Sequence, residues 1–251
     1  MEPTSSANGR LQSVTRALSV LACFRNGENL GVSAIARQLD LPVSTTHRLL
    51  SALVEAGFLD KVDSPSRYRL GTTLAEYGQL AYRQHRIHLA EPRLEELATI
   101  TGAKASIATR HGNDAVLLGT SSWREADGHE LQGLRLPLHA SALGKALLAW
   151  AQTSEEELTW LPYDSGTARS ISGPVELGKE LAHTRERGYA FNDEELVRGF
   201  RTIGVPIGDE PGQVRFALGL RGPVELMIDE RVPFFVDLAK VTARKIADVL
   251  H

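Results

Sequence analysis

The sequence predicts an α+β protein in two parts: an N-terminal winged helix-turn-helix and a C-terminal domain built on a mixed or antiparallel sheet. Apolar residues recur at helical spacing up to about residue 56, and two short strands follow them. Beyond Gly102, segments with the composition of strands alternate with helices. The chain has 251 residues, of which 42% are hydrophobic, and this is enough for a separate core in each part.

Charge is distributed unevenly along the chain. The first 88 residues carry ten Lys and Arg against seven Asp and Glu, whereas the remaining residues carry 18 against 24. A net charge of −3 for the whole chain argues against unspecific binding to nucleic acid. The difference between the two parts is compatible with an N-terminal part that faces nucleic acid and a C-terminal part with another role.

Three short helices are predicted in the N-terminal part. The third runs from Thr45 to Ala56, with Ser44 as its N-cap and Gly57 as its terminator. The second is the segment AIARQL, which Ser33 caps, and the segment DLPVS makes a tight connection because proline cannot extend a preceding helix. The first helix ends at the breaker NGENLG. Its apolar positions are Val14, Ala17, Leu18, Leu21 and Phe24.

The third helix has two chemically different faces. At about 100° per residue, its apolar face consists of Thr46, Leu49, Leu50 and Leu53. The opposite face carries short hydroxyl groups and one base, and it carries no acid. Its residues are Ser44, Arg48 and Ser51, flanked by Thr45 and His47. A helix face that only meets water usually carries Lys and Glu, so this composition favours another role.

The hydroxyl-rich face predicts binding to DNA. Short side chains let a helix enter the major groove closely, where the hydroxyls and the helix N-terminus bind phosphates. Arg48 then reaches a base edge or a phosphate. A short helix, a tight turn and a second helix also make up the helix-turn-helix pattern. A solvated helix face is the alternative interpretation.

A basic hairpin follows the third helix. The segments FLDKV and RYRL are expected to form two strands around the turn DSPS, with Lys61, Arg67 and Arg69 on or near them. Such a wing adds affinity by lying along the neighbouring DNA backbone or minor groove, although it could also serve only as a structural cap. The predicted contacts to a double-stranded DNA operator are Ser44, Thr45, Thr46, His47, Arg48, Ser51, Arg67 and Arg69.

A helix from Thr73 to about Arg86 is expected to join the two parts, and a second helix then ends at Gly102. We therefore expect a winged domain over residues 1–72, a linker helix over 73–88 and an effector-binding domain over 89–251.

The linker helix is expected to pack against a second copy of the chain. One helix-turn-helix reads half of a typical operator, and a dimer supplies the other half. The helix also presents more apolar surface than one winged domain can cover. A homodimer is the expected state, and a tetramer stays open. His85 and His88 could bind a metal with a third ligand, but histidines at a helix end are more often plain surface residues.

The C-terminal part contains four predicted helical segments and two strand pairs. AKASIATR and DAVLLGT are strands around the turn HGND, and FRTIGVPIG and QVRFALGLRG are strands around DEPG. The helix SALGKALLAWA is capped by Ser141, and a capping box from Ser154 to Glu157 starts another helical segment. PVELGKELAHTRERG is a helix that Gly188 closes, and the last helix is DERVPFFVDLAKVTARKIADVL.

No group of residues in the C-terminal part amounts to a predicted catalytic site. The segment SALGK is not a phosphate-binding loop, because His139 stands where that loop requires glycine. His139, Ser141 and the distant Asp193 leave a Ser-His-Asp arrangement open by counting alone, but no G-x-S-x-G segment supports it. The acidic run 193–195 is more typical of a solvated loop or helix start than of a cation site.

We expect a cytoplasmic protein without an enzyme activity, a cofactor or a metal. No apolar run approaches the roughly 20 residues of a membrane-spanning helix, and the start MEPTSSANGR lacks the apolar segment of a signal peptide. The single cysteine, Cys23, excludes a disulfide framework and a cysteine-rich zinc site. Its neighbours Val20, Leu21 and Phe24 indicate that it fills the core.

Segments in both parts of the chain resemble the IclR family of transcriptional regulators. In the N-terminal part they are ALSVLACF, GVSAIARQLDLPVSTTHRLLSALVEAGFLDK and YRLG. In the C-terminal part they are RLPLHASALGKALLA, TRERGYAFNDEELVRGFRTIGVPI and LGLRGP. The resemblance covers both parts and the spacing between them. It implies a winged helix-turn-helix, a linker helix and a GAF-like effector-binding domain with a central antiparallel sheet.

The resemblance also implies a function. Members of this family form dimers, often paired into tetramers on DNA, and they repress or activate catabolic genes in response to a small metabolite, frequently an organic acid. The expected function is therefore a ligand-responsive, DNA-binding regulator of a catabolic operon. The alternatives are a small-molecule-binding module or a hydrolase that acts without DNA.

The resemblance implies an effector-binding site at the positions where the motifs align. These positions are Ala142, Leu143, Asn192, Thr202, Gly219 and Arg221. Family members that bind small keto acids have a carboxylate where this chain has Asn192, and two serines where it has Gly219 and Arg221. The resemblance therefore does not extend to a two- or three-carbon keto acid as the effector.

We expect an anionic effector that is larger than a small keto acid, such as an aromatic carboxylate. Strand alternation in RFALGLRG places Ala217, Gly219 and Arg221 on one face, opposite Phe216, Leu218 and Leu220. If the first face lines the pocket, Gly219 vacates volume and Arg221 offers a two-pronged donor for a carboxylate. The helix that starts near Ser141 adds backbone N–H groups, and Trp123 could cover a ring. The alternative is that Arg221 extends into solvent at a sheet edge.

Overall fold

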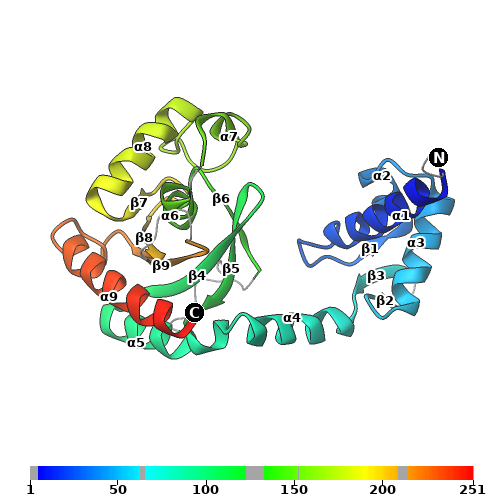
Figure 1. Ribbon diagram of the computed structural model, residues 1–251, viewed down its shortest axis with the longest axis horizontal. Helices are drawn as coiled ribbons and strands as arrows, with labels where there is room; N and C mark the ends of the chain where they lie inside the picture. The colour runs from blue at the N-terminus through cyan, green and yellow to red at the C-terminus, as the bar shows by residue number, and fades with distance from the viewer. Residues whose placement is uncertain (1–4, 63–65, 123–132, 152, 209–213, 251) are drawn as a thin grey trace. The chain divides into compact units, whose positions relative to one another are not determined.

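The computed structural model describes residues 5–62, 66–122, 133–151, 153–208 and 214–250. The chain forms two compact units, Met1–Ala81 and Tyr82–His251, and each is described by itself (Figure 1). None of the helices in the described ranges is both long enough and apolar enough to cross a membrane.

The first unit is a helix-turn-helix with a three-stranded antiparallel sheet. The sheet order is β1-β3-β2, which confirms the predicted hairpin and adds the two-residue strand β1 that the sequence reading missed. The elements are α1 (Ser5–Ala22), β1 (Leu30–Gly31), α2 (Val32–Gln38), α3 (Val43–Glu55), β2 (Leu59–Val62), β3 (Arg67–Leu70) and α4 (Thr72–Gln84), which continues into the second unit.

The core of the first unit is built from α1, α2, α3 and the hairpin. Its fully or nearly fully buried members are Val20, Cys23, Phe24, Ile35, Leu50, Leu53, Leu59 and Tyr68. Cys23 is therefore a core residue, as expected. Val14 and Leu18, two of the apolar positions of the first predicted helix, are 58% and 62% exposed and so do not belong to this core. The buried face of α1 is rotated toward Val20 and Cys23, so Val14 and Leu18 point away from the core.

The turn between α2 and α3 is held by backbone hydrogen bonds. The N–H of Leu41 donates to the carbonyl of Ala36 at 2.9 Å, and the N–H of Asp40 donates to that of Arg37 at 3.4 Å. Asp40 has a φ of 51°, the left-handed conformation that this type of helix ending requires. The backbone, rather than side-chain caps, therefore fixes how the two helices meet.

The predicted caps of α2 and α3 are wrong. Gly31 and Pro42 occupy the N-cap positions, so Ser33 and Ser44 lie inside the first helical turns. Proline at the N-cap of α3 has no N–H that could stay unpaired. Both helices therefore begin before the serines that the sequence suggests as caps. Ser44 is thereby available on the helix surface instead of being used as a cap.

The second unit is a six-stranded sheet in the order β6-β5-β4-β9-β8-β7, antiparallel throughout. This confirms the α+β class with an antiparallel sheet. The helices are the 3₁₀ helix η1 (Ile87–Leu89), α5 (Glu91–Thr101), α6 (Ala142–Trp150), α7 (Glu155–Thr159), α8 (Pro174–Arg187) and α9 (Val232–Leu250). The strands are β4 (Lys104–His111), β5 (Asp114–Thr120), β6 (Arg135–Pro137), β7 (Ala190–Asp193), β8 (Phe200–Ile207) and β9 (Phe216–Pro223). The sequence reading missed β6 and β7, the two short edge strands.

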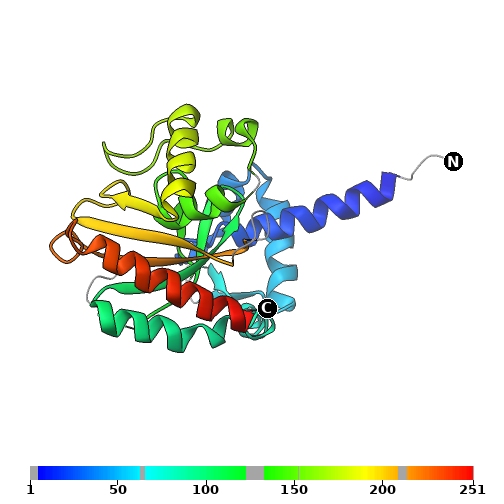
Figure 2. The same ribbon diagram turned by 60° about the vertical axis from the view of Figure 1, so that its left-hand side comes forward.

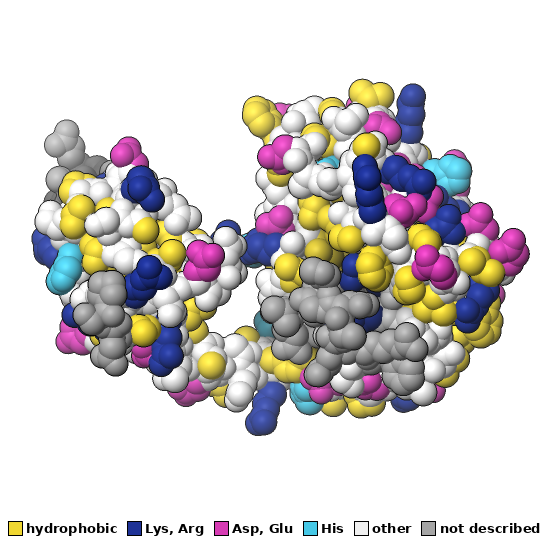
Figure 3. Space-filling view, turned by 180° about the vertical axis from the view of Figure 1, so that it is seen from behind, with side chains coloured by type: hydrophobic (Ala, Val, Ile, Leu, Met, Phe, Trp, Pro, Cys, Tyr) yellow, Lys and Arg dark blue, Asp and Glu magenta, His cyan; other side chains and the backbone are white. Residues whose placement is uncertain are grey.

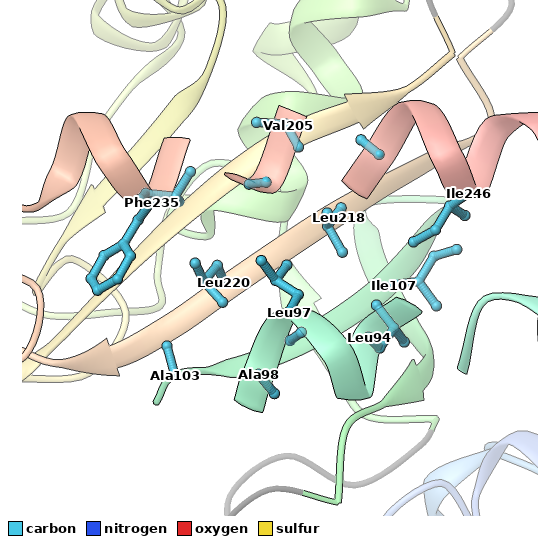
Figure 4. Packing of buried hydrophobic residues seen from close by; sticks show 14 of the residues in the cluster. Leu94, Leu97, Ala98, Ala103, Ile107, Val205, Leu218, Leu220, Phe235 and Ile246 are labelled. Carbon is cyan, nitrogen blue, oxygen red and sulfur yellow. The ribbon is translucent and has the colours of Figure 1, made fainter. Parts of the chain in front are cut away.

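Helices cover both faces of this sheet. Helices α5 and α9 lie on one face, and α6 and α8 lie on the other (Figures 1 and 2). Between the sheet and α5 and α9, Leu97, Leu218, Leu220 and Phe235 are among the buried residues that pack together (Figure 4). Ala217 belongs to the core on the opposite face, which confirms the predicted alternation along β9.

Helix α6 lies directly on the sheet backbone. A Cβ atom on Gly204 of β8 would stand 2.3 Å from the carbonyl oxygen of Ala142 at the start of α6. Ser141 caps this helix as predicted, because its Oγ accepts a hydrogen bond from the N–H of Gly144 at 3.1 Å. Only glycine on β8 lets the first turn of α6 approach this closely.

We expect the substitution Gly204→Ala to lower the free energy of unfolding by about 1–3 kcal/mol, because the added methyl group must push α6 away from β8. Urea unfolding of the full chain, followed by circular dichroism, measures this change. The control is Gly178→Ala on α8, where a Cβ would have no neighbour closer than 4.0 Å. Alanine there should leave stability unchanged or raise it slightly. Equal stability of the two variants would contradict the backbone contact.

Candidate functional site

The outer face of α3 is the first candidate site. Ser44, His47, Arg48 and Ser51 are exposed and Thr45 is half-buried, as the helical pattern predicts. Among the described residues, none forms a hydrogen bond or an ion pair with the Arg48 side chain. This face therefore presents hydroxyl groups, an imidazole and a guanidinium to solvent.

Thr46 does not belong to this surface, although the sequence reading included it among the DNA contacts. It is completely buried, and its hydroxyl donates to the carbonyl of Pro42 at 3.1 Å. The prediction of a DNA contact is wrong for this residue, because its side chain is used to hold the first turn of α3 against the core.

The hairpin of β2 and β3 lies beside the end of α3. Tyr68 is buried, while its neighbours Arg67 and Arg69 are exposed on the other face of the strand. Arg69 Nε lies 3.4 Å from Asp60 Oδ2 across the hairpin, and Arg67 donates to the carbonyl of Asn29 at 3.5 Å. Both arginines are thus held near the wing surface with their guanidinium groups still open to solvent.

Backbone contacts just after β3 fix the wing, which is the hairpin of β2 and β3, against the end of α3. The N–H of Gly71 donates to the carbonyl of Phe58 at 2.8 Å, and a Cβ on Gly71 would meet the carbonyl of Gly57. Gly57 is also the residue that ends α3, with a φ of 73°. The end of α3 and the end of the hairpin are therefore joined backbone to backbone.

In the second unit, the predicted effector residues are brought together on the sheet face under α6. Thr202 on β8 is paired with Arg221 on one side and with Asn192 on the other. One step along the same face, Gly219 is paired with Gly204. A polar row and a glycine row thus lie next to each other below the first turn of α6.

Helix α6 supplies the opposite wall with Ala142 and Leu143. Leu143 fills the space beside Gly219, since a Cβ on that glycine would stand 3.0 Å from Leu143 Cγ. The expectation that Gly219 vacates volume for a ligand is therefore wrong in this conformation. The amide of Asn192 donates a short hydrogen bond to the carbonyl of Ala140, which ties β7 to the segment before α6. Trp123 lies outside the described residues.

Arg221 is buried rather than extended into solvent. Its side chain is 8% exposed, and its guanidinium lies 4.0 Å from the centre of the Phe200 ring. Phe200 precedes Thr202 by two residues on β8 and so shares its face, a role that strand alternation could have revealed. Lys104 on β4 is paired with Arg221, which places two cationic residues side by side. An aromatic ring and adjacent cations form a suitable lining for an organic anion.

Neither described pocket is lined by the six predicted effector residues. One, of about 550 Å³, lies on the side of α8 and the end of β7, and Lys145 and Glu195 contribute to its wall. The sequence analysis did not identify Lys145 as a site residue, although a charged lysine within the otherwise apolar helix SALGKALLAWA could have indicated it. Burial raises the pKa of Glu195, while the ammonium of Lys145 acts against this rise.

The geometry gives no catalytic pair at His139 and Ser141. The Ser141 hydroxyl donates to the carbonyl of Pro137 at 2.7 Å, and His139 Nε2 lies 3.2 Å from the carbonyl of Ser165. Burial lowers the pKa of His139. In the described parts of the chain, no three His, Cys, Asp or Glu residues are placed to hold a metal, and His85 and His88 are exposed surface residues.

A winged helix-turn-helix joined to a separate sheet domain defines a helix-turn-helix transcriptional regulator. Residues 79–248 match the family model described as bacterial transcriptional regulator IclR C-terminal, and residues 13–63 match the IclR helix-turn-helix domain. The chain belongs to the IclR family.

Relatives with known names are similar over nearly the whole chain. Transcriptional repressor IclR of Escherichia coli (strain K12) is 32% identical over 253 residues, which cover 97% of this chain and 91% of that protein. HTH-type transcriptional repressor AllR of Salmonella paratyphi A is 33% identical over 258 residues, covering 99% and 93%. The solved structure of an IclR homolog complexed with 4-hydroxybenzoate, from Microbacterium hydrocarbonoxydans, is 27% identical with a TM-score of 0.78, covering 95% of this chain and 98% of that chain.

Proposed function

We propose that this transcriptional regulator binds an operator through the outer face of α3 and the hairpin of β2 and β3. The observation that carries the proposal is the exposed, acid-free face of α3, on which Arg48 has no partner among the described residues. The contacting residues we propose are Ser44, Thr45, His47, Arg48, Ser51, Arg67 and Arg69. Two of the relatives named above, IclR and AllR, are named transcriptional repressors, so we also propose repression as the mode of action.

We further propose that the regulator binds DNA as a homodimer in which α4 packs against a second copy, and that two dimers can pair. None of the described side chains of α4 is buried, and Tyr77 and Leu80 are 53% and 49% exposed. Val14 and Leu18 add a second exposed apolar stripe on α1. Burying both stripes between two copies would remove apolar surface from water and would place two recognition helices on one operator.

For the effector, we propose an organic carboxylate that enters between the first turn of α6 and the row of Arg221, Thr202 and Asn192. The buried guanidinium suits a carboxylate, and Phe200 offers a ring next to it. An IclR homolog binds 4-hydroxybenzoate, an aromatic carboxylate, which supports the same ligand class here. Leu143 must change rotamer or move with α6 to admit the ligand, and this movement would connect the effector to the rest of the chain. We propose that the regulated genes belong to a catabolic operon.

For the DNA interface, we expect Arg48→Ala to weaken binding to the DNA upstream of the protein's own gene by about 1–3 kcal/mol. Fluorescence anisotropy at fixed salt measures this loss. The control is Arg244→Ala on α9, which removes an exposed arginine of the second unit and should leave the affinity unchanged. Equal affinities of Arg48→Ala and the unsubstituted protein would contradict the proposed interface.

For the dimer, Leu80→Glu should raise the dissociation constant at least about tenfold. A buried leucine contributes about 1.5–3 kcal/mol, and a symmetric interface contains it twice. Sedimentation equilibrium measures the change, with Gln79→Glu, an exposed position outside the stripe of Tyr77 and Leu80, as the control for added charge. A 27.4 kDa species for the unsubstituted protein at micromolar concentration would refute the dimer.

For the effector site, aromatic carboxylates should bind at least tenfold more tightly than their neutral amides, and Arg221→Gln should remove this difference. Calorimetry with benzoate, 4-hydroxybenzoate and the two amides measures both effects. Arg215→Gln, just before β9, controls for the loss of a nearby positive charge. The anion proposal fails if amides bind as well as acids, or if Arg221→Gln leaves the affinity for acids untouched.

A further inference from the structure

The pocket beside α8 is lined by charged side chains of both signs. It has a volume of about 550 Å³, which is within the usual range for a small-molecule site. Glu180 and Lys179 come from α8, Lys145 from α6, Arg169 from the preceding loop, and Glu195 from the segment after β7. Figure 3 shows basic, acidic and histidine side chains gathered on the surface over α8. None of the proposed effector residues lines this pocket.

Lys145 forms the buried base of the pocket and is held by two hydrogen bonds and a further ion pair. Its side chain is 1% exposed, and its ammonium lies 2.6 Å from Glu195 Oε1, 2.5 Å from the carbonyl oxygen of Phe191 and 3.4 Å from Glu180 Oε1. An ammonium has three donors, of which two bind Glu195 and Phe191, and the carboxylate of Glu180 adds an ion pair. Glu180 Oε1 also lies 2.7 Å from Arg187 Nη2.

Only one of the two carboxylate oxygens of Glu195 has a hydrogen-bond partner among the described residues. Its Oε1 accepts from Lys145, whereas its Oε2 is buried and has no hydrogen-bond partner among the described residues. The residue as a whole is 9% exposed. A buried carboxylate oxygen without a donor is costly, and burial raises the pKa of this carboxyl for the same reason. An added donor at Oε2, and a cationic one most of all, would offset that cost.

Two basic side chains in the wall of the pocket, Arg169 and Lys179, differ in whether an acidic residue already pairs with them. Arg169 is already engaged, at 2.7 Å from Glu194 Oε1 and 3.3 Å from Asp193 Oδ2. Lys179 is exposed, and no described residue pairs with its ammonium. A ligand whose cationic end meets Glu195 can therefore place an anionic end toward Lys179.

We propose that this pocket is a second ligand site, separate from the anion site, and that it binds a small zwitterion of the α-amino acid class. The protonated amine of the ligand donates to Glu195 Oε2, and its carboxylate faces Lys179. No bond is made or broken. Because Lys145 follows Leu143 by two residues on α6, the ligand would be held against the same helix that borders the proposed effector site.

Calorimetry on the full-length protein without DNA tests the proposal. The probes are glycine, L-alanine, L-serine and L-glutamine, each with its N-acetyl derivative and with the corresponding acid that lacks the amino group. We expect saturable binding of at least one amino acid, and at least tenfold weaker binding of its N-acetyl derivative and of the acid that lacks the amino group. Glu195→Gln should weaken the amino acid at least tenfold, and Glu186→Gln, an exposed position on α8, should not.

A second variant keeps the test decisive if Glu195→Gln does not fold. Lys179→Met changes an exposed side chain and should weaken the amino acid while leaving the matching primary amine unaffected. The proposal is overturned if no amino acid gives saturable heat, if N-acetylation makes no difference, or if neither variant changes the affinity. Repeating the titration with Arg221→Gln separates this site from the anion site, because amino acid binding should persist in that variant.

Discussion

The second unit depends on the contact between the backbone of α6 and the backbone of β8 at Gly204. This contact brings the first turn of α6 onto the sheet, and Ser141 closes the turn by binding the N–H of Gly144. Leu143 then comes to rest on Gly219, and Lys145, further along the helix, reaches the end of β7. One close approach thus determines the wall of the proposed effector site and the base of the pocket beside α8.

Lys145 adds an electrostatic link between α6 and the elements around it. The ammonium of Lys145 is 1% exposed, the carboxylates of Glu195 and Glu180 offset its charge, and the carbonyl of Phe191 accepts a hydrogen bond from it. Removal of Glu195, the nearer carboxylate, would leave the buried charge with only the more distant Glu180. The three partners belong to α8, β7 and the segment after β7. A movement of α6 therefore cannot leave β7 and α8 unaffected, which gives the domain a physical route from a bound ligand to the arrangement of its helices.

Periodicity in the sequence predicted the elements with long, regular patterns. Helix α3, the hairpin of β2 and β3, and the strands β4, β5, β8 and β9 follow from apolar spacing and from the turns between them. The edge strands β6 and β7 were missed because three or four residues carry too little pattern. The caps at Ser33 and Ser44 were misplaced because the fold starts each helix earlier. The closed space at Gly219 and the partners of Lys145 depend on contacts between distant segments, which no local pattern reveals.

The short edges of the six-stranded sheet restrict how copies of this protein can meet. The inner strands β4, β8 and β9 have eight residues each, whereas the edges β6 and β7 have three and four. Edges this short offer little unpaired backbone to another strand, so the sheet is protected against growth by strand addition. The homodimer proposed above, which uses side chains on helices α1 and α4, is consistent with these protected edges and would be a contact that can be undone without unravelling a sheet.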